Sequence, residues 1–374
     1  MTATERLYQL IDADSHVNEP PGLWLERLPA RFRDRAPRMQ RFDEGDAWIF
    51  DGVDAPINFG LNAAAGIPST DFNPWVRWED IRPGGHDPKA RLEEMDADRV
   101  DAAILYPTPR ISHAVFGTPD PAFHLALVRA YNDWLLDFCS EDPSRLGAAV
   151  VLPNCGAAAA LEEYERVAHH PGTRAALIGQ YPHGGLVPDR DDDLVWRALS
   201  DTGVALHIHV GLVEGTPSGK GGTKVPGDLR LYDAPTRILQ LIWDGAFVRF
   251  PDLQLVMVEV DCGWIPYMKE QADDRYFRMR LGTTYGVPRP PSHYFEHNIS
   301  FTYISDHFGI RNRHDIGVER IMWSSDYPHV PANWPNSWRT IEAEFSGVPR
   351  DERDLILAGN AQRLYGFAAG APAR

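Results

Sequence analysis

Four short polar clusters stand where apolar runs of the sequence end, and their residue types are those that bind metal ions and move protons. The clusters contain Asp12, Asp14 and His16, then His207 and His209, then Glu259 and Asp261, and last Asp326 and His329. Imidazole nitrogens and carboxylate oxygens bind divalent cations, and both groups serve as general acids or bases. Together the clusters predict a metal-dependent active site assembled from several strands.

The spacing within the clusters selects the ligands. Asp14 and His16 are two residues apart, so in an extended strand they point to the same side and can reach one ion. His209 lies nearer its strand end than His207, so we predict His209 as the ligand, and His207 as either an inner-layer histidine or a substrate-binding residue. Asp326 stands at the tip of the last strand. The predicted set is therefore Asp14, His16, His209 and Asp326 around one divalent cation.

Three residues are predicted to be catalytic: Asp326, Glu259 and His329. Asp326 can bind the metal and also exchange a proton with substrate or water. Glu259 can be a general base, a hydrogen-bond partner of a metal-bound histidine, or half of a buried ion pair. His329 either hydrogen-bonds the substrate or only braces its loop. Arg110, in the segment ILYPTPR, is the predicted substrate-binding clamp for a carboxylate.

The predicted ligands are two imidazoles and two carboxylates, with no thiolate. Such a set accepts Zn²⁺ and also suits Mn²⁺, Fe²⁺ or Mg²⁺, so the metal stays open, with zinc, manganese or iron as the expected ions. The cysteines Cys139, Cys155 and Cys262 are too few and too scattered for a disulfide framework or a cysteine-based zinc site.

The elements that must position these residues alternate regularly from about residue 87 onward. Apolar strands are expected at 101–107, 146–153, 175–181, 204–210, 253–260, 299–305 and 321–326, with one more before Asp14. Helical patterns separate them, and no glycine-rich nucleotide motif follows any strand. About eight strand–helix units predict an α/β fold of the (β/α)₈ TIM-barrel class, whose active site lies at the carboxyl ends of the strands.

One long segment, about 26–85, departs from the barrel rhythm and is predicted to be an insertion after the first strand. It carries Trp48, Trp75 and Trp78, and WIFDGVDAPINFG reads as a hairpin. The tryptophans either form a small core of the insertion's own or belong to a lid or dimer element. The glycine-rich loop at 214–228 is a candidate mobile lid beside His209. We predict a single domain over 1–374 that closes with a C-terminal helix.

Composition limits the partners. The formal net charge of −16 argues against nucleic acid, because no basic stripe is present to neutralise phosphates. No run of about 18 apolar residues occurs and the amino-terminal segment lacks a signal-peptide pattern, so we expect no membrane association and a cytoplasmic, reduced location. The expected partner is a small-molecule substrate.

Five motifs in this order resemble the amidohydrolase superfamily, in particular the group of aminocarboxymuconate semialdehyde decarboxylase and γ-resorcylate decarboxylase. The motifs are IDADSHVNEPPGLW, ALHIHVG, WIPY, IMWSSDYPH and NAQRLYGF, and they span nearly the whole chain. The resemblance implies a metal-dependent (β/α)₈ barrel that forms a homodimer or higher homo-oligomer.

The resemblance also maps site residues onto this chain. The family's first-strand pair falls on Asp14-x-His16, which looks more like the Glu-x-His of the mononuclear decarboxylases than like His-x-His. The fifth-strand histidine falls on His209 and the eighth-strand aspartate on Asp326. The sixth-strand histidine of the family is missing, and Glu259 is the candidate to take its part. No lysine stands in GQYPHGG to bridge two metals, so a binuclear site is not expected.

Two reactions fit this site. The first is non-oxidative decarboxylation of a small aromatic or enol-type carboxylic acid chelated to the metal, with Asp326 as proton donor. The alternative is hydrolysis of an amide, lactone or C–C bond by metal-activated water, with Asp326 or Glu259 as general base. A pure binding module would lack a ligand, and none of the four is missing.

Overall fold

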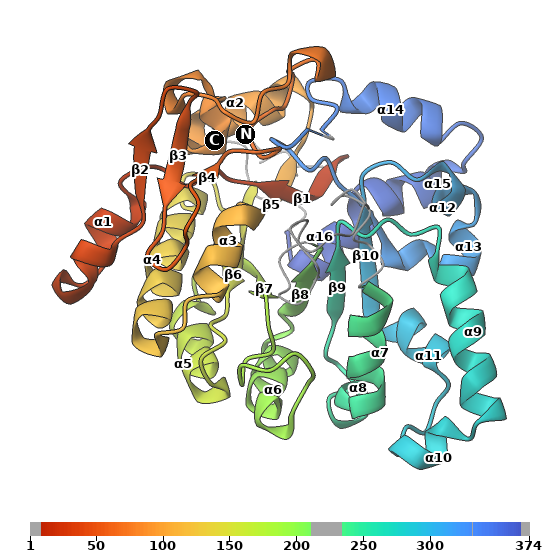
Figure 1. Ribbon diagram of the computed structural model, residues 1–374. Helices are drawn as coiled ribbons and strands as arrows, with labels where there is room; N and C mark the ends of the chain where they lie inside the picture. Colours follow the sequence, from red (N-terminus) through yellow and green to blue (C-terminus); the bar gives the residue numbers. More distant parts are fainter. Residues whose placement is uncertain (1–8, 211–233, 331, 368–374) are drawn as a thin grey trace, which may run out of the picture.

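Eight parallel strands form the centre of the computed structural model, which describes residues 9–210, 234–330 and 332–367 (Figure 1). The strands are β1 Ile11–His16, β5 Ala102–Tyr106, β6 Leu146–Val151, β7 Thr173–Ile178, β8 Ala205–His209, β9 Leu255–Val258, β10 Ile299–Tyr303 and β11 Ile321–Trp323. Each strand pairs with the next one in this order, and β1 and β11 are the two ends of the series. Beyond the end of β11, backbone hydrogen bonds join the chain to β1, from Asp326 N to Asp14 O and from His16 N to Tyr327 O. The strands therefore form a nearly closed barrel, and the predicted (β/α)₈ class is confirmed.

The strands form a barrel because the residues on both of their faces are buried. Every residue of β6 (LGAAVV) is buried, and so is every residue of β8 and β9. Strands buried on both faces are typical of parallel sheets that are covered by helices. Alanines such as Ala148, Ala149, Ala175 and Ala176 are 0% exposed and let neighbouring layers approach closely.

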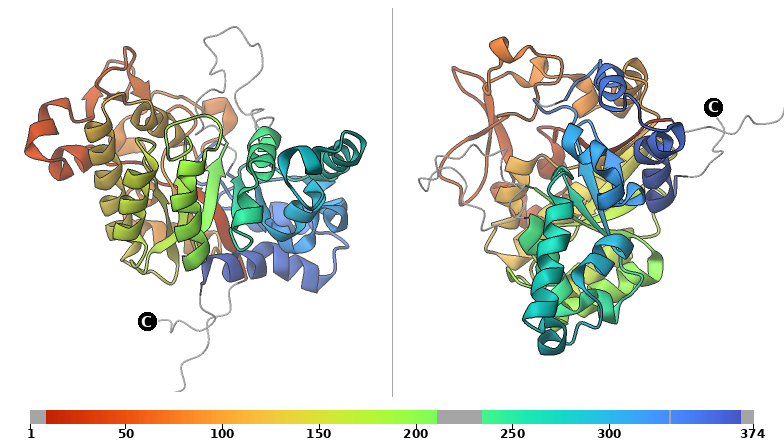
Figure 2. Two further views of the ribbon diagram at one scale, coloured as in Figure 1. Left: turned by 90° about the horizontal axis from the view of Figure 1, so that it is seen from below. Right: turned by 90° about the vertical axis from the view of Figure 1, so that its right-hand side faces the viewer.

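Helices form an outer layer around the strands (Figure 2). They are α2 Pro88–Ala97, α3 Pro109–Phe116, α4 Pro121–Cys139, α5 Ala157–Val167, α6 Asp193–Thr202, α7 Ala234–Asp244, α8 Ala246–Arg249, α9 Ile265–Arg278, α10 Leu281–Tyr285, α11 Pro291–His297, α12 His307–Arg311, α13 Arg313–Ile316, α14 Ser337–Glu344, α15 Arg350–Asp354 and α16 Asn360–Tyr365. Helix α6 illustrates the packing, since Val195, Trp196 and Leu199 are buried on one side of it. Asp87 and Asp120 cap α2 and α4 by accepting hydrogen bonds from backbone N–H groups of the first turn. No helix among the described residues is long and apolar enough to cross a membrane.

Two helices that the sequence pattern predicts as continuous are interrupted. The pattern at 234–251 becomes α7 and α8 because Gly245 takes a left-handed conformation with φ 77°. The final pattern becomes α15 and α16 joined by a π-helical turn at Leu355–Gly359. Helices α3, α10 and α11 were not predicted, since each is short, and α3 and α11 also begin at prolines.

The insertion after β1 has a small sheet of its own. It contains α1 Leu23–Arg27 and the antiparallel strands β2 Arg38–Arg41, β3 Asp46–Ile49 and β4 Ile57–Asn58. The predicted hairpin is confirmed, since Trp48 of β3 lies opposite Ile57 of β4. Trp48 packs edge-on against Trp24 of α1 with ring centroids 5.2 Å apart. Trp48 therefore joins the main hydrophobic core through Trp24, and the prediction of a core of the insertion's own does not hold for it. Trp75 and Trp78 are half-buried.

A second part of the insertion reaches the carboxyl ends of the barrel strands. Ala64 N and Ala65 N donate to Pro328 O at 2.8 and 2.9 Å, and Val330 N donates to Leu61 O at 3.0 Å. The loop that follows β11, which carries His329, is therefore fixed to the insertion. The predicted lid at 214–228 lies outside the described residues.

Candidate metal centre

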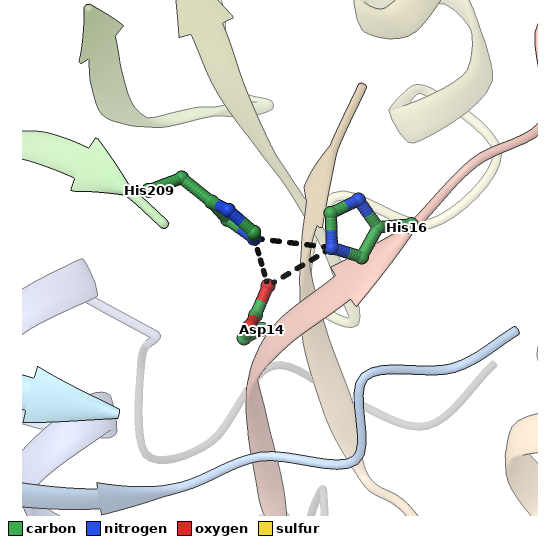
Figure 3. A group of neighbouring side chains, drawn as sticks. All are labelled: Asp14, His16 and His209. Atoms are coloured by element: carbon green, nitrogen blue, oxygen red, sulfur yellow. Dashed lines mark hydrogen bonds and ion pairs between the residues drawn. The ribbon is translucent and has the colours of Figure 1, made fainter. Parts of the chain in front are cut away.

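Asp14, His16 and His209 converge at the carboxyl ends of β1 and β8 (Figure 3). The Nε2 atoms of His16 and His209 are 3.2 Å apart. Asp14 Oδ1 lies 3.4 Å from His16 Nε2 and 3.3 Å from His209 Nε2. All three side chains are 0% exposed, so these polar atoms face one another out of contact with bulk water.

The other ring nitrogen of each histidine is engaged with the backbone. His16 Nδ1 lies 2.9 Å from Pro107 O, and His209 Nδ1 lies 2.5 Å from Val210 O. A carbonyl oxygen can only accept, so Nδ1 must carry the proton in both rings. This assigns the tautomer and leaves each Nε2 with a free lone pair. Both histidines are thus oriented as ligands toward the same point.

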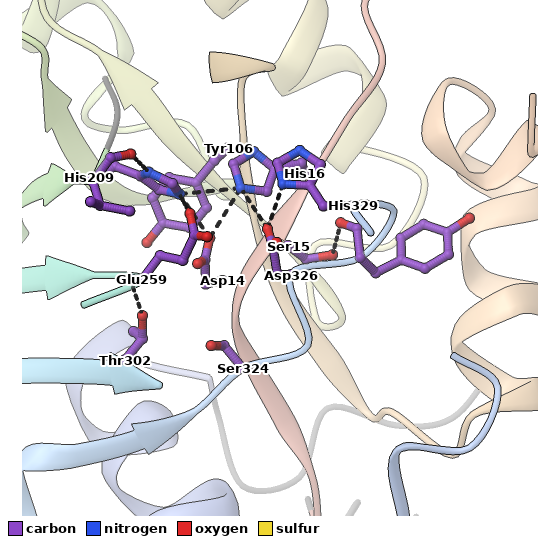
Figure 4. A network of polar contacts seen from close by, with 12 residues as sticks. Asp14, Ser15, His16, Tyr106, His209, Glu259, Thr302, Ser324, Asp326 and His329 are labelled. Atoms are coloured by element: carbon purple, nitrogen blue, oxygen red, sulfur yellow. Dashed lines mark hydrogen bonds and ion pairs between the residues drawn. The ribbon is translucent and has the colours of Figure 1, made fainter. Parts of the chain in front are cut away.

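Asp326 completes the predicted set from the opposite side (Figure 4). Its Oδ1 lies 3.3 Å from His16 Nε2 and 2.6 Å from Nδ1 of His329. The His329 ring stacks on the His16 ring with centroids 4.0 Å apart. His329 is therefore positioned by two of the predicted ligands, and it lies within proton-transfer distance of Asp326.

Glu259 reaches the same point from the end of β9. Its Oε2 lies 3.7 Å from His209 Nε2, and its side chain keeps 24% exposure. One oxygen each from Asp14, Glu259 and Asp326 lie within 4.8 Å of one another. The predicted catalytic residues Asp326, Glu259 and His329 thus stand together with the predicted ligands.

The separation of these atoms fits one divalent cation. Metal–ligand bonds of about 2.0–2.2 Å place neighbouring ligand atoms about 3 Å apart and opposite ones about 4.4 Å apart. His16 Nε2 lies 3.2–3.4 Å from His209 Nε2 and from an oxygen each of Asp14 and Asp326, and these distances lie in that interval. The 3.3 Å between Asp14 Oδ1 and His209 Nε2 also does. Within the described part of the chain, the oxygens of Asp14 and Asp326 accept no hydrogen bond of normal geometry. A cation would satisfy these buried oxygens.

The electrostatics lead to the same conclusion. Burial disfavours ionised Asp14, but His209 and His16 outweigh it and hold the pKa of Asp14 below its usual range. Burial also disfavours a charged His16 ring, yet hydrogen bonds to Asp14 and Asp326 raise the pKa of His16 well above its ordinary value. Positive charge between Asp14 and Asp326, from a proton or from a metal ion, therefore stabilises their ionised carboxylates.

The backbone conformations of Asp326 and Glu259 orient their carboxylate side chains toward the candidate metal centre. Asp326 and Glu259 both adopt left-handed conformations, with φ 56° and 57°. Such values are uncommon outside glycine, and they persist where the surroundings enforce them. Around Asp326, the neighbouring Ser325 donates to Asp12 Oδ1 through its backbone N–H at 2.8 Å. Around Glu259, the backbone N–H donates to Thr302 Oγ1 at 2.8 Å.

Arg91 is a site residue that sequence reasoning missed. This residue is 1% exposed and contacts the segment that carries His16. It donates to Ser15 Oγ at 2.7 Å, to Gly84 O at 2.6 Å and to the carbonyl oxygen of His16, and it stacks over the Tyr327 ring. The sequence offers only an arginine within a charged helix, PKARLEEMDA, which carries no sign of burial.

The predicted substrate-binding residues occupy different places. His207 is 0% exposed and its Nδ1 lies 2.6 Å from the Tyr106 hydroxyl, below the ligands in the barrel interior. Burial lowers the pKa of His207 to about 3, so its ring is neutral. Arg110 lies at the start of α3 and donates to the Asn58 carbonyl oxygen at 2.9 Å. Neither residue contacts the four predicted ligands among the contacts found in the described chain.

A family model described as Amidohydrolase matches residues 11–367 of this chain. The chain belongs to the amidohydrolase family. It is therefore an enzyme of the amidohydrolase superfamily, a metal-dependent carboxy-lyase or hydrolase, as the sequence motifs predicted. The match includes β1 at one end and α16 at the other, and so covers every barrel strand.

Individual relatives narrow the comparison. The chain is 26% identical over 328 residues to gamma-resorcylate decarboxylase of Rhizobium sp. (strain MTP-10005), covering 79% of this chain and 93% of that protein. The crystal structure of an amidohydrolase, map2389c, from Mycobacterium avium subsp. paratuberculosis K-10 has a TM-score of 0.76 and 23% identity, covering 98% of this chain and 100% of the other. A dihydroxybenzoic acid decarboxylase from Polaromonas sp. JS666, solved with manganese and 2-nitroresorcinol, has a TM-score of 0.62 and 19% identity, covering 96% and 97%. These structures share the fold of this chain.

Proposed function

We propose that this protein is a non-oxidative decarboxylase of a small aromatic or enol-type carboxylic acid, which binds through one divalent cation. The observation that carries the proposal is the orientation of His16 and His209, whose Nε2 atoms face each other at 3.2 Å beside Asp14. The relatedness to gamma-resorcylate decarboxylase supports this reaction class. The carboxylate-rich ligand set also supports this reaction class, because a cation that prefers oxygen ligands can also bind two oxygen atoms of the substrate.

The proposed centre consists of Asp14, His16, His209 and Asp326. A cation held there would supply positive charge to orient the substrate carboxylate and a neighbouring phenolic or carbonyl oxygen. Manganese is the first candidate, because a structural neighbour was solved with bound manganese. Zinc and iron are the alternatives that the same ligands accept.

Asp326 is the proposed proton donor. It delivers a proton to the carbon that bears the carboxylate, the bond to the carboxylate carbon breaks, and CO₂ leaves while the electron pair returns to the ring or enol system. No oxidant is needed, because the proton replaces the carboxylate on carbon. Asp326 Oδ1 and His329 Nδ1 are 2.6 Å apart, so this pair can hold the proton and His329 can resupply it.

The remaining site residues have subordinate roles in this proposal. His207 supports the ligands from below through Tyr106, rather than through contact with the substrate. Arg110 can clamp a substrate carboxylate if its guanidinium exchanges Asn58 for the substrate. A homodimer or higher homo-oligomer and a cytoplasmic location are further parts of the proposal, which light scattering and cell fractionation would test.

The reaction is tested by supplying metal-reconstituted enzyme with hydroxybenzoates and, separately, with small amides and lactones. CO₂ release and acid production are followed independently. We expect CO₂ from at least one hydroxybenzoate and no hydrolysis product. Acid production from an amide or lactone without CO₂ release would replace this proposal with the hydrolase alternative.

The proton donor is tested with Asp326→Asn. Loss of a positioned general acid costs about 10²–10⁴ in rate, so the variant should lose nearly all turnover. It should still bind one metal ion per chain, because three predicted ligands and the amide oxygen remain. Asp261→Asn is the matched control, since Asp261 lies at the same end of the barrel without joining the ligand cluster. Normal turnover by Asp326→Asn would show that the proton comes from elsewhere.

A further inference from the structure

Glu259 is positioned by its backbone and not by a basic partner. It follows β9 directly with φ 57°, and Thr302 Oγ1 of β10 accepts its backbone N–H at 2.8 Å. Across residues 9–210, 234–330 and 332–367, its carboxylate forms an ion pair with His209 and with no lysine or arginine. The side chain is therefore aimed at the ligand cluster by the turn that ends β9.

Three carboxylates meet where Glu259 points. Oxygens of Asp14, Glu259 and Asp326 lie within 4.8 Å of one another, and Asp14 and Asp326 are almost fully buried. Like charges so close in a buried site disfavour their common ionisation unless positive charge lies between them.

The distances of Glu259 suit direct coordination. Glu259 Oε2 is 3.7 Å from His209 Nε2, between the separations of about 3 Å for neighbouring and about 4.4 Å for opposite ligands of one ion. One oxygen each of Asp14, Glu259 and Asp326 lie within 4.8 Å of one another. Glu259 thus needs little side-chain movement to bind the ion that Asp14 and Asp326 bind.

We propose that Glu259 is a fifth protein ligand, so that the cation is held by three carboxylates and two imidazoles. This inference rests on the proposed metal centre but not on the proposed reaction. Carboxylate oxygens are preferred by Mn²⁺ and Mg²⁺, whereas Zn²⁺ is satisfied by four ligands that include imidazole. Glu259 should therefore strengthen Mn²⁺ binding more than Zn²⁺ binding, so that the difference between the two affinities becomes smaller.

The test measures metal binding without substrate. Metal-stripped full-length protein is titrated with Mn²⁺, and free Mn²⁺ is followed by electron paramagnetic resonance, with Zn²⁺ titrated in parallel. Glu259→Gln and Glu259→Ala should raise the Mn²⁺ dissociation constant at least about tenfold and the Zn²⁺ constant much less. Water proton relaxation should report one additional exchangeable water on Mn²⁺ bound to Glu259→Ala.

Asp261→Asn is the matched control for charge. Asp261 is two residues away, is also left-handed with φ 52°, and lies outside the carboxylate group that surrounds the ion. We expect the Mn²⁺ dissociation constant of Asp261→Asn to stay within about threefold of the wild-type value. Binding of one Zn²⁺ per chain by each Glu259 variant would show that the variant folds.

Equal effects of Glu259→Gln and Asp261→Asn, or an unchanged water count in Glu259→Ala, would overturn direct ligation. Wild-type protein that binds neither ion would overturn the metal centre itself, and this inference with it. Metal binding as expected together with absent CO₂ release would refute only the proposed reaction.

Discussion

Glu19 offers a stability prediction that is independent of the metal. It follows β1 and is 1% exposed, and its Oε1 accepts the Thr108 backbone N–H at 2.9 Å. Its Oε2 has no hydrogen-bond partner among the described residues and borders a small cavity lined by Trp24, Phe116 and Tyr131. Burial raises the pKa of Glu19 from its ordinary value of 4.5 to about 7. The perturbation that tests this environment is Glu19→Gln.

The sign of the effect follows from proton linkage. Between pH 4.5 and about 7 the folded protein holds the Glu19 proton and the unfolded chain has lost it, so stability falls as pH rises through this window. The difference between 4.5 and about 7 corresponds to about 3 kcal/mol, because one pH unit is worth about 1.4 kcal/mol. Glutamine cannot ionise, and its Oε1 can keep the Thr108 hydrogen bond. Relative to wild type, Glu19→Gln should therefore gain about 2–3 kcal/mol between pH 5 and pH 8.

Thermal unfolding of wild type and variant at both pH values measures this gain. Comparison at equal pH cancels the titration of every other group, and the melting-temperature difference should grow by several degrees from pH 5 to pH 8. Glu26→Gln is the control, since Glu26 is an exposed residue of α1 and should give a small difference that is the same at both values. A difference for Glu19→Gln that does not change with pH would refute the assignment of Glu19 as a carboxyl group buried without a counter-charge.

Two further predictions concern the support of the metal centre. Arg91→Lys cannot keep all the contacts that Arg91 makes with Ser15, His16 and Gly84, so we expect the Mn²⁺ dissociation constant to rise about tenfold. The control is Arg145→Lys, which changes a buried arginine at the amino end of β6 and should leave this constant unchanged. Equal constants for the two variants would contradict a positioning role for Arg91. Removal of metal with EDTA should lower the melting temperature, and Mn²⁺ at about 100 times its dissociation constant should restore about 2.7 kcal/mol of stability; a melting temperature insensitive to both would mean that the folded state gains nothing from the ion.

The barrel and most of its site could be predicted because strand ends carry a strong local signal. A strand buried on both faces shows a continuous apolar run, so the residue at which the run stops marks the mouth of the barrel. Asp14, His16 and His209 were predicted in this way, and the structure brings their polar atoms within 3.4 Å of one another. The spacing of two residues between Asp14 and His16 sufficed to place both on one side of β1.

The rest depends on tertiary contacts that leave no local pattern. Arg91 lies in a charged helix whose sequence is typical of a solvated surface, yet its guanidinium is buried because the carbonyl oxygen of His16 and the Ser15 hydroxyl need a donor there. The left-handed conformation of Glu259 is enforced by Thr302, a residue of the next strand. The segment PKARLEEMDA does not distinguish Arg91 from an ordinary surface charge. The end of an apolar run predicts the place of Glu259, but it does not predict the left-handed backbone there.

We call the contact between β1 and the segment that follows β11 the seam of the barrel. Its residues give a reason to expect that metal binding and barrel closure depend on each other. These strands end the sheet order, and they are joined through the ligand segments by Asp326 N to Asp14 O, His16 N to Tyr327 O and Ser325 N to Asp12 Oδ1. Asp14 and His16 lie on one side of this seam and Asp326 on the other. A cation bound by all three would link β1 to the segment after β11, and a change that separates these two segments would also separate the candidate ligands. The candidate metal ligands thus lie where the two ends of the sheet order meet, which is where an ion would add a connection between them.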